Sequence, residues 1–208
     1  MIGPLEVIQW GFTGWVTWSC LVYLKSGEWR DDYKIFLGHS VLDWLKLVAS
    51  AMCVLAFTIT IVVTLYAYGP SALRWSWLNL LTDPKKEPSP TNLNLAGASI
   101  PYFGVFFLLM LFLNLPRLAR REEEMFREGT KDWKDAIPRS LKFGLIHCVV
   151  GVPIGLGLCL AIPGMWFTHQ YFRGGVDKAT LYHAVNNMLV VGFILTVMIL
   201  GKLLPHSF

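Results

Sequence analysis

The sequence predicts an all-α protein, a polytopic bundle of about five transmembrane helices. Its 208 residues are 54% hydrophobic and only 15% charged, whereas soluble proteins are about 25% charged. The charged residues are clustered, so that five long runs contain no Asp, Glu, Lys or Arg. A helix crosses a bilayer with about 17–25 apolar residues, and each run reaches that length. The runs, of 18, 27, 29, 30 and 23 residues, are Val7–Leu24, Leu47–Leu73, Pro88–Pro116, Phe143–Phe172 and Ala179–Gly201.

Composition and motifs exclude several classes of protein. The formal charge is +4 at pH 7, and the basic residues lie at the edges of the apolar runs rather than on a recognition helix, which argues against nucleic-acid binding. No GxGxxG motif is present, so a dinucleotide-binding fold is not expected. The cysteines form no CxxC pair, and we expect small buried side chains with no disulfide scaffold, metal or cofactor. They are Cys20, Cys53, Cys148 and Cys159.

The N-terminal region, residues 1–87, is predicted to contain two spans and a Pro-rich loop. Met1 to Glu6 contains no Lys or Arg and no small-residue cleavage site follows the first run, so we expect that run to stay in the membrane. The prolines and charges of residues 83–90 predict a surface loop before a helical core at 88–208. Tryptophans near the run ends are typical of the membrane interface. They are Trp10, Trp29, Trp44, Trp75, Trp77 and Trp166.

The fourth run is rich in residues that bend helices or allow close packing. It contains Pro153, Pro163 and five glycines, which predicts a kinked or closely packed span. These glycines could pack against the fifth span or against a second copy of the chain, so the sequence leaves the oligomeric state open.

The distribution of Lys and Arg predicts an N-out, C-in orientation. Positive residues stay on the cytoplasmic side, and with the N-terminus outside, thirteen of the eighteen lie in the inside loops. We therefore expect a multi-pass integral protein of the plasma membrane. The inside residues are Lys25, Arg30, Lys34, Lys46, Arg117, Arg120, Arg121, Arg127, Lys131, Lys134, Arg139, Lys142 and Lys202. The outside residues are Arg74, Lys85, Lys86, Arg173 and Lys178.

A charged cluster directly follows the third run. Glu123 and Arg127 are four residues apart, so on a helix they share a face and can pair. Glu122 is rotated by about 100° and is free to face another group. The alternative is a charged helix next to the membrane that binds lipid headgroups.

A histidine lies about one turn inside the fourth run. Phe143 and His147 are four residues apart and share a helical face, whereas Cys148 points off that face and gives little support to a Cys–His nucleophile. Ionisable residues inside a membrane are usually functional. The alternative is a hydrogen bond between packed helices.

Two polar residues begin the fifth run. His183 and Asn187 are four residues apart and predict paired hydrogen-bond donors on one helical face. Two such donors can stabilise an oxyanion in a dry site. The alternative is again interhelical hydrogen bonding.

Taken in order, these three clusters form the motifs EExxxR, FxxxH and HxxxN. The set resembles the CPBP family, which is also called Abi and includes the type II CAAX prenyl endopeptidases, a group of glutamate-dependent intramembrane proteases. The resemblance covers roughly residues 117–187 and the flanking spans, and the first hundred residues contain no signature of the family. It implies a metal-free hydrolase whose catalytic motifs lie on the C-terminal helices and whose substrate is a membrane-associated peptide or protein.

The resemblance also implies a role for each motif residue. Glu122 would be the general base that activates water, assisted by His147, while His183 and Asn187 would form the oxyanion hole. The remaining motif residues would be supporting ones: Glu123 and Arg127 as an ion pair that orients the motif helix, and Phe143 as a support for His147. The charged segment 117–142 predicts a shallow site that faces the cytoplasm.

Two other functions remain open on the sequence alone. Glu122, His147 and His183 could be zinc ligands, although no HExxH helix is present. The chain could also be a non-catalytic protein of the same fold that binds a peptide, as an immunity or scaffold protein would. Transport is not favoured, because the first three runs offer no continuous polar path.

Overall fold

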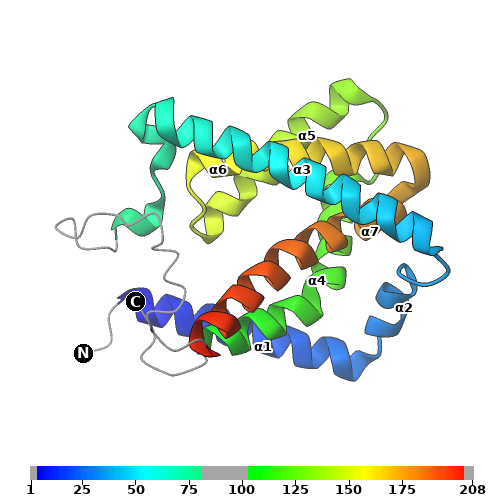
Figure 1. Ribbon diagram of the computed structural model, residues 1–208, viewed down its shortest axis with the longest axis horizontal. Coiled ribbons are helices and arrows are strands. Elements are labelled where there is room, and N and C mark those ends of the chain that lie inside the picture. Colours follow the sequence, from blue (N-terminus) through cyan, green and yellow to red (C-terminus); the bar gives the residue numbers. More distant parts are fainter. Residues whose placement is uncertain (1–3, 81–102, 204–208) are drawn as a thin grey trace.

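The computed structural model describes residues 4–80 and 103–203, and every regular element in these ranges is helical (Figure 1). The predicted domain boundary at 87/88 and the loop at 83–90 lie outside the described residues. The elements are α1 (Pro4–Ser26), α2 (Trp29–Lys34), α3 (Val41–Tyr68), η1 (Ser71–Arg74), η2 (Trp77–Leu80), α4 (Phe103–Arg127), α5 (Trp133–Ile146), η3 (His147–Val150), α6 (Ile154–Cys159) and α7 (Ala161–Leu203).

Local capping chemistry sets the helix ends that matter for the site. Ser40 and Asp43 form a reciprocal capping box at the start of α3, and Asp132 caps α5 by accepting a hydrogen bond from the Asp135 backbone N–H. Gly129, at φ 76°, provides the left-handed residue just after α4. The turn between α4 and α5 is therefore encoded locally.

The helices form two groups around α7 (Figure 1). In one group, Val16 of α1 and Leu115 of α4 pack with Val191 in the C-terminal half of α7. In the other, Leu47 and Ala51 of α3 pack against α7 near its middle. Helix α7 thus contacts both groups and carries residues to the centre of the molecule.

Helix α7 is interrupted at Gly174 and Gly175. Gly175 has φ 70° and ψ −165°, a conformation that is essentially restricted to glycine. The two halves, 161–173 and 176–203, therefore run in different directions (Figure 1). This interruption separates the predicted fourth span from the fifth.

Two stretches of the described chain are long and apolar enough to cross a membrane, Val41–Tyr68 and Ile154–Leu200. Helix α3 is also largely unburied, since only 17% of its most apolar window is covered. Its exposed side chains are large and hydrophobic, which is unusual for a helix in contact with water. They include Leu42, Leu45, Met52, Phe57, Ile59 and Val63.

The predicted fourth span is not a single helix. Helix α5 ends at Ile146, and the chain turns through η3, Gly151 at φ 93° and Pro153 before α6 begins. The left-handed glycine and the proline together terminate the helix rather than bend it. Residues 133–173 therefore form a hairpin, with α5 packed against α6 and the first half of α7.

Ion pairs show which loops lie at the same end of the molecule. Arg120 contacts Asp32 of α2 at 2.7 Å and Asp177 of α7 at 2.8 Å. The turn at 173–178 therefore lies beside α2, and not at the opposite end as the N-out, C-in prediction requires. The fourth run therefore supplies two antiparallel segments, whereas the sequence predicts one crossing. The second half of α7 then runs away from this end, so its last turn lies at the end where α1 begins (Figure 1).

The hairpin depends on a close approach between two glycines. A Cβ built on Gly144 would lie 2.1 Å from the carbonyl oxygen of Gly157 and 2.9 Å from the backbone N of Ala161. Since backbone atoms cannot rotate away, we expect Gly144→Ala to destabilise the protein by about 3 kcal/mol. The control is Gly14→Ala in α1, where a Cβ meets nothing within 4 Å. Unfolding in detergent should separate the two variants, and equal stability would contradict this packing.

Candidate active site

A buried ion pair lies on the last turns of α4. Glu123 and Arg127 are both 0% exposed, and Arg127 Nε lies 3.3 Å from Glu123 Oε2. This confirms the pairing that the spacing predicts. Arg127 Nη2 also donates a hydrogen bond of 3.1 Å to the Gly164 carbonyl oxygen. The pair therefore ties α4 to the first half of α7.

Aromatic rings enclose the guanidinium group. Arg127 Cζ lies 4.2 Å from the centroid of the Phe143 ring, and 5.8 and 5.9 Å from those of Phe126 and Phe167. The faces of aromatic rings attract cations, and guanidinium is only weakly hydrated. The rings thus compensate in part for the loss of water around the buried charge.

His183 joins the ion pair to the second glutamate. Its Nδ1 lies 2.8 Å from Glu123 Oε1, and its Nε2 lies 3.6 Å from Glu122 Oε2. The ring is stacked on Phe167, with centroids 4.4 Å apart, and touches Phe143 edge-on. A carboxylate only accepts hydrogen bonds, so Nδ1 carries a hydrogen and Nε2 is directed toward Glu122. The orientation of the imidazole is fixed on three sides.

Glu122 is the more accessible of the two carboxylates. Its side chain is 32% exposed, in contrast to the fully buried Glu123. Its Oε2 is buried beside His183 and has no hydrogen-bond partner among the described residues. The predicted difference between a paired and a free glutamate is therefore confirmed. Glu122 has one oxygen against the buried network and part of its side chain open to a ligand or water.

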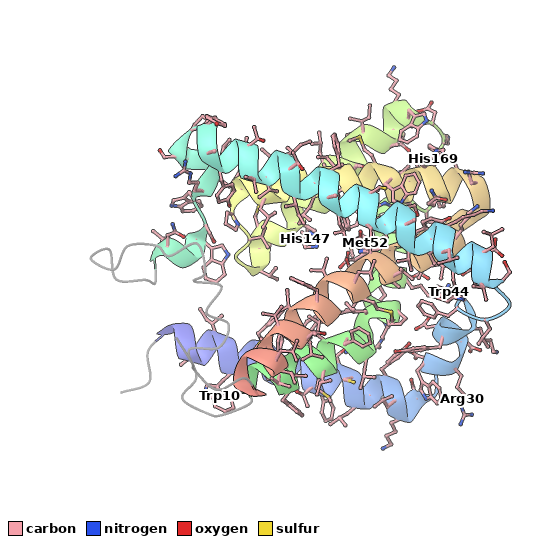
Figure 2. The ribbon with its side chains drawn as sticks, viewed as in Figure 1. Trp10, Arg30, Trp44, Met52, His147 and His169 are labelled. Carbon is pink, nitrogen blue, oxygen red and sulfur yellow. The ribbon has the colours of Figure 1, made fainter. Side chains whose placement is uncertain are left out.

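His147 is the C-cap of α5 and the first residue of η3, so it lies at a helix end rather than one turn inside a continuous helix. Its Nδ1 is 2.8 Å from the Phe143 carbonyl oxygen, and its ring contacts the Phe143 ring at 5.2 Å. A carbonyl oxygen only accepts, so Nδ1 carries the hydrogen and Nε2 of the neutral ring is an acceptor. Figure 2 shows this half-buried ring between the hairpin and the C-terminal half of α7. Phe143 is thus the residue that links His147 to His183.

The structure does not join the two residues of the predicted oxyanion hole. His183 is engaged with the glutamates, whereas Asn187 is half-buried and makes no side-chain hydrogen bond within the described part of the chain. The structure therefore brings together Glu122, Glu123, Arg127, Phe143 and His183. His147 joins them through Phe143 alone, and Asn187 is not connected by a polar contact.

Sequence reasoning missed two contributors from the first half of α7. Phe167 supplies the ring on which His183 stacks, and Gly164 supplies the carbonyl oxygen that Arg127 binds. A Cβ on Gly164 would lie 2.9 Å from Phe143 Cδ1 and 3.1 Å from Arg127 Nη2. The only sequence signal for these two residues is the i, i+3 spacing of Gly164 and Phe167, and many apolar helices contain such a spacing.

The site combines two carboxylates, one guanidinium and an imidazole in aromatic surroundings. Among residues 4–80 and 103–203, no group of three His, Cys, Asp or Glu side chains is placed to hold a metal ion. A half-open carboxylate beside a fixed imidazole can accept a proton from water and return it. No protein-family model matches the chain, and neither a curated protein nor a solved structure is significantly similar to it.

Proposed function

We propose that this chain is a membrane-embedded endopeptidase in which Glu122 activates water, as its motifs suggest by resemblance to the CPBP family. The observation that carries the proposal is the position of Glu122. It lies 3.6 Å from the imidazole of His183, which is held by the buried Glu123–Arg127 pair. Such a network fixes a general base at one edge of an apolar interior without requiring a metal.

The exposed apolar surface of α3 supports the membrane location. We propose that α1, α3, α4 and the second half of α7 cross the bilayer, and that the 133–173 hairpin enters from the end that holds α2. In this arrangement the hairpin no longer counts as a crossing, and the start of α1 and the end of α7 lie on the outer side. Fourteen of the eighteen Lys and Arg residues then lie at the cytoplasmic end, which strengthens the charge bias beyond the five-span arrangement.

Cysteine labelling distinguishes the two arrangements. Arg173 and Lys34 are exposed, as is Tyr68 at the opposite end of α3. In a background without Cys53 and Cys148, we expect Arg173→Cys and Lys34→Cys to react with an impermeant maleimide from the cytoplasmic side. Tyr68→Cys should react from the outside. If Arg173→Cys labels with Tyr68→Cys instead, the five-span arrangement is restored.

The proposed reaction is a single water attack. The Glu122 carboxylate takes a proton from water, and the resulting hydroxide adds to the carbonyl carbon of the scissile peptide bond. When the tetrahedral intermediate collapses, the C–N bond breaks and the leaving nitrogen receives the proton from Glu122. Hydrolases commonly use one group in this way, first as the general base and then as the general acid.

The two histidines support different parts of this reaction. The Nε2 of His147 is an acceptor in the neutral ring and could orient the attacking water. His183 is closer to Glu122 than its proposed role in an oxyanion hole requires, and its contacts favour a role in fixing that carboxylate. Asn187 then stays a candidate donor to the oxyanion, but His183 on the same helix no longer acts as the second donor.

The experiment compares new peptide termini in membranes from cells that express the native chain or Glu122→Gln at equal abundance. Termini specific to the native chain would support proteolysis and identify a substrate. Identical profiles, with the variant inserted and folded, would favour the non-catalytic peptide-binding function. A stoichiometric zinc lost together with activity on chelation would replace the metal-free mechanism with the zinc-dependent one.

A further inference from the structure

An apolar groove lies outside the candidate active site. It is a groove of about 630 Å³ between α3, the first turn of α5 and the first half of α7. Its walls are almost entirely apolar and include Cys53, Phe57, Trp133, Met165, Trp166 and His169. None of these residues belongs to the network around Glu122. The volume falls in the range of about 300–1,000 Å³ that is typical of small-molecule sites.

Aromatic stacking shapes one end of the groove. The His169 ring stacks with two indoles, with centroid distances of 6.4 Å to Trp133 and 5.7 Å to Trp166. Figure 2 shows His169 on α7 next to the first turns of α5. Indole and imidazole rings with an apolar body and a polar edge are typical of the boundary between hydrocarbon and headgroups. This end therefore corresponds to the interfacial depth of a membrane.

The charges around that end are basic. Lys131 and Lys134 flank Trp133, and Arg173 follows Phe172, whose ring contacts Trp133 at 5.3 Å. Lys46 lies two helical turns before Cys53 on nearly the same face of α3. All four cations are exposed.

The nearby acids are already engaged. The Asp132 carboxylate caps α5, and Asp135 pairs with Arg139 at 3.0 Å. The basic residues are therefore free to attract an anion at the mouth of an apolar groove.

We propose that this groove binds one acyl chain of an anionic phospholipid, with the headgroup at the Lys131–Trp133–Lys134 end. The apolar lining of the groove suits a hydrocarbon chain, and the cations suit a phosphate-bearing headgroup with net negative charge. The inference rests on the proposed membrane location but not on proteolysis. Trp166 is followed in sequence by Phe167, which stacks on His183, so an occupied groove would also buttress the helix that supports the site.

The test uses Cys53 as a site-specific reporter. A bimane label on Cys53, in a Cys148→Ala background, is placed in nanodiscs that contain brominated phosphatidylglycerol or brominated phosphatidylcholine at equal mole fraction. Of the four cysteines predicted to be buried, Cys20 and Cys159 are buried and should not react. The prediction is wrong for Cys53, which is exposed, and for Cys148, which is half-buried. We expect anionic lipid to be enriched at the groove by about fivefold over the bulk bilayer, and hence to quench more strongly.

The matched control places the label at nearly the same height along α3 but on a different face of the helix. Met52 is also exposed, and it lies about 1.5 Å along α3 from Cys53 and about 100° around the helix. A label attached through Met52→Cys, with Cys53→Ala, should be quenched equally by both lipids. The double substitution Lys131→Gln/Lys134→Gln should reduce the preference at Cys53, while its unfolding temperature in detergent reports that the fold is kept.

Two outcomes would overturn the proposal. Equal quenching by both lipids at Cys53 and at position 52 would mean that the groove is ordinary lipid-facing surface. Quenching at position 52 but not at Cys53 would mean that protein or peptide fills the groove. Because the readout requires no substrate, either result is independent of whether Glu122 is a catalytic base.

Discussion

Glu123→Gln is expected to destabilise the protein by about 3–5 kcal/mol, because it leaves a buried guanidinium without a counter-charge. Arg127 is 0% exposed and its only ion-pair partner among the described residues is Glu123. The glutamine keeps the size of the side chain and a carbonyl oxygen for His183, so the loss of charge is the main change. Denaturant unfolding in micelles measures the effect.

The double variant Glu123→Gln/Arg127→Met provides the control. Removing both charges takes away the uncompensated cation, and buried pairs replaced by neutral groups often recover stability. We expect it to be more stable than Glu123→Gln alone, despite the lost hydrogen bond to Gly164. Purely additive effects of the two substitutions would show that the residues are not coupled.

Glu122→Gln is expected to lower the rate of peptide cleavage by about 100- to 10,000-fold, the usual contribution of a general base. The amide cannot accept the proton of water, but it is nearly the same size as the carboxylate. Because the Glu122 side chain is 32% exposed, we expect the substitution to change the unfolding free energy of the protein by less than about 1 kcal/mol. Cleavage of a substrate found from the new termini measures the rate.

Glu124→Gln is the matched control for this variant. Glu124 belongs to the same run of three glutamates, but its side chain is exposed and outside the network. It should cleave at nearly the native rate. If Glu124→Gln and Glu122→Gln lose activity equally, the effect belongs to the charged surface and the proposed base is wrong.

The two neighbouring glutamates should therefore differ in the property that they control. Substitution of the buried Glu123 should reduce stability, and substitution of the accessible Glu122 should reduce rate. Their difference of about 100° around α4 is what separates these effects.

Local features of the molecule were predictable from the sequence, and long-range ones were not. The helical class and the Glu123–Arg127 pairing follow from composition and from i, i+4 spacing, and the structure confirms both. The sequence predicted a kinked or closely packed span where the chain reverses after His147, because Gly151 and Pro153 give similar local signals for a bend and for a turn. Only the packing of Gly144 on Gly157 decides between them.

The partners of His183 illustrate the same limit. The helical spacing of His183 and Asn187 predicted that both donate hydrogen bonds to one oxyanion. In the structure, His183 instead contacts Glu123, which lies 60 positions away in the sequence. No periodicity within one helix reveals such a contact. The ion pairs of Arg120 with Asp32 and Asp177 likewise join distant segments, and no spacing within one helix predicts them.

The bridge that His183 forms between Glu122 and Glu123 has a consequence for biogenesis. The ribosome makes α4 well before the second half of α7, so during translation the motif glutamates exist for a time without their imidazole. A nascent chain therefore lacks the imidazole that orients Glu122 until the second half of α7 has been made. If the proposed function is right, synthesis order itself would keep the site inactive while the chain is still attached to the translocation machinery.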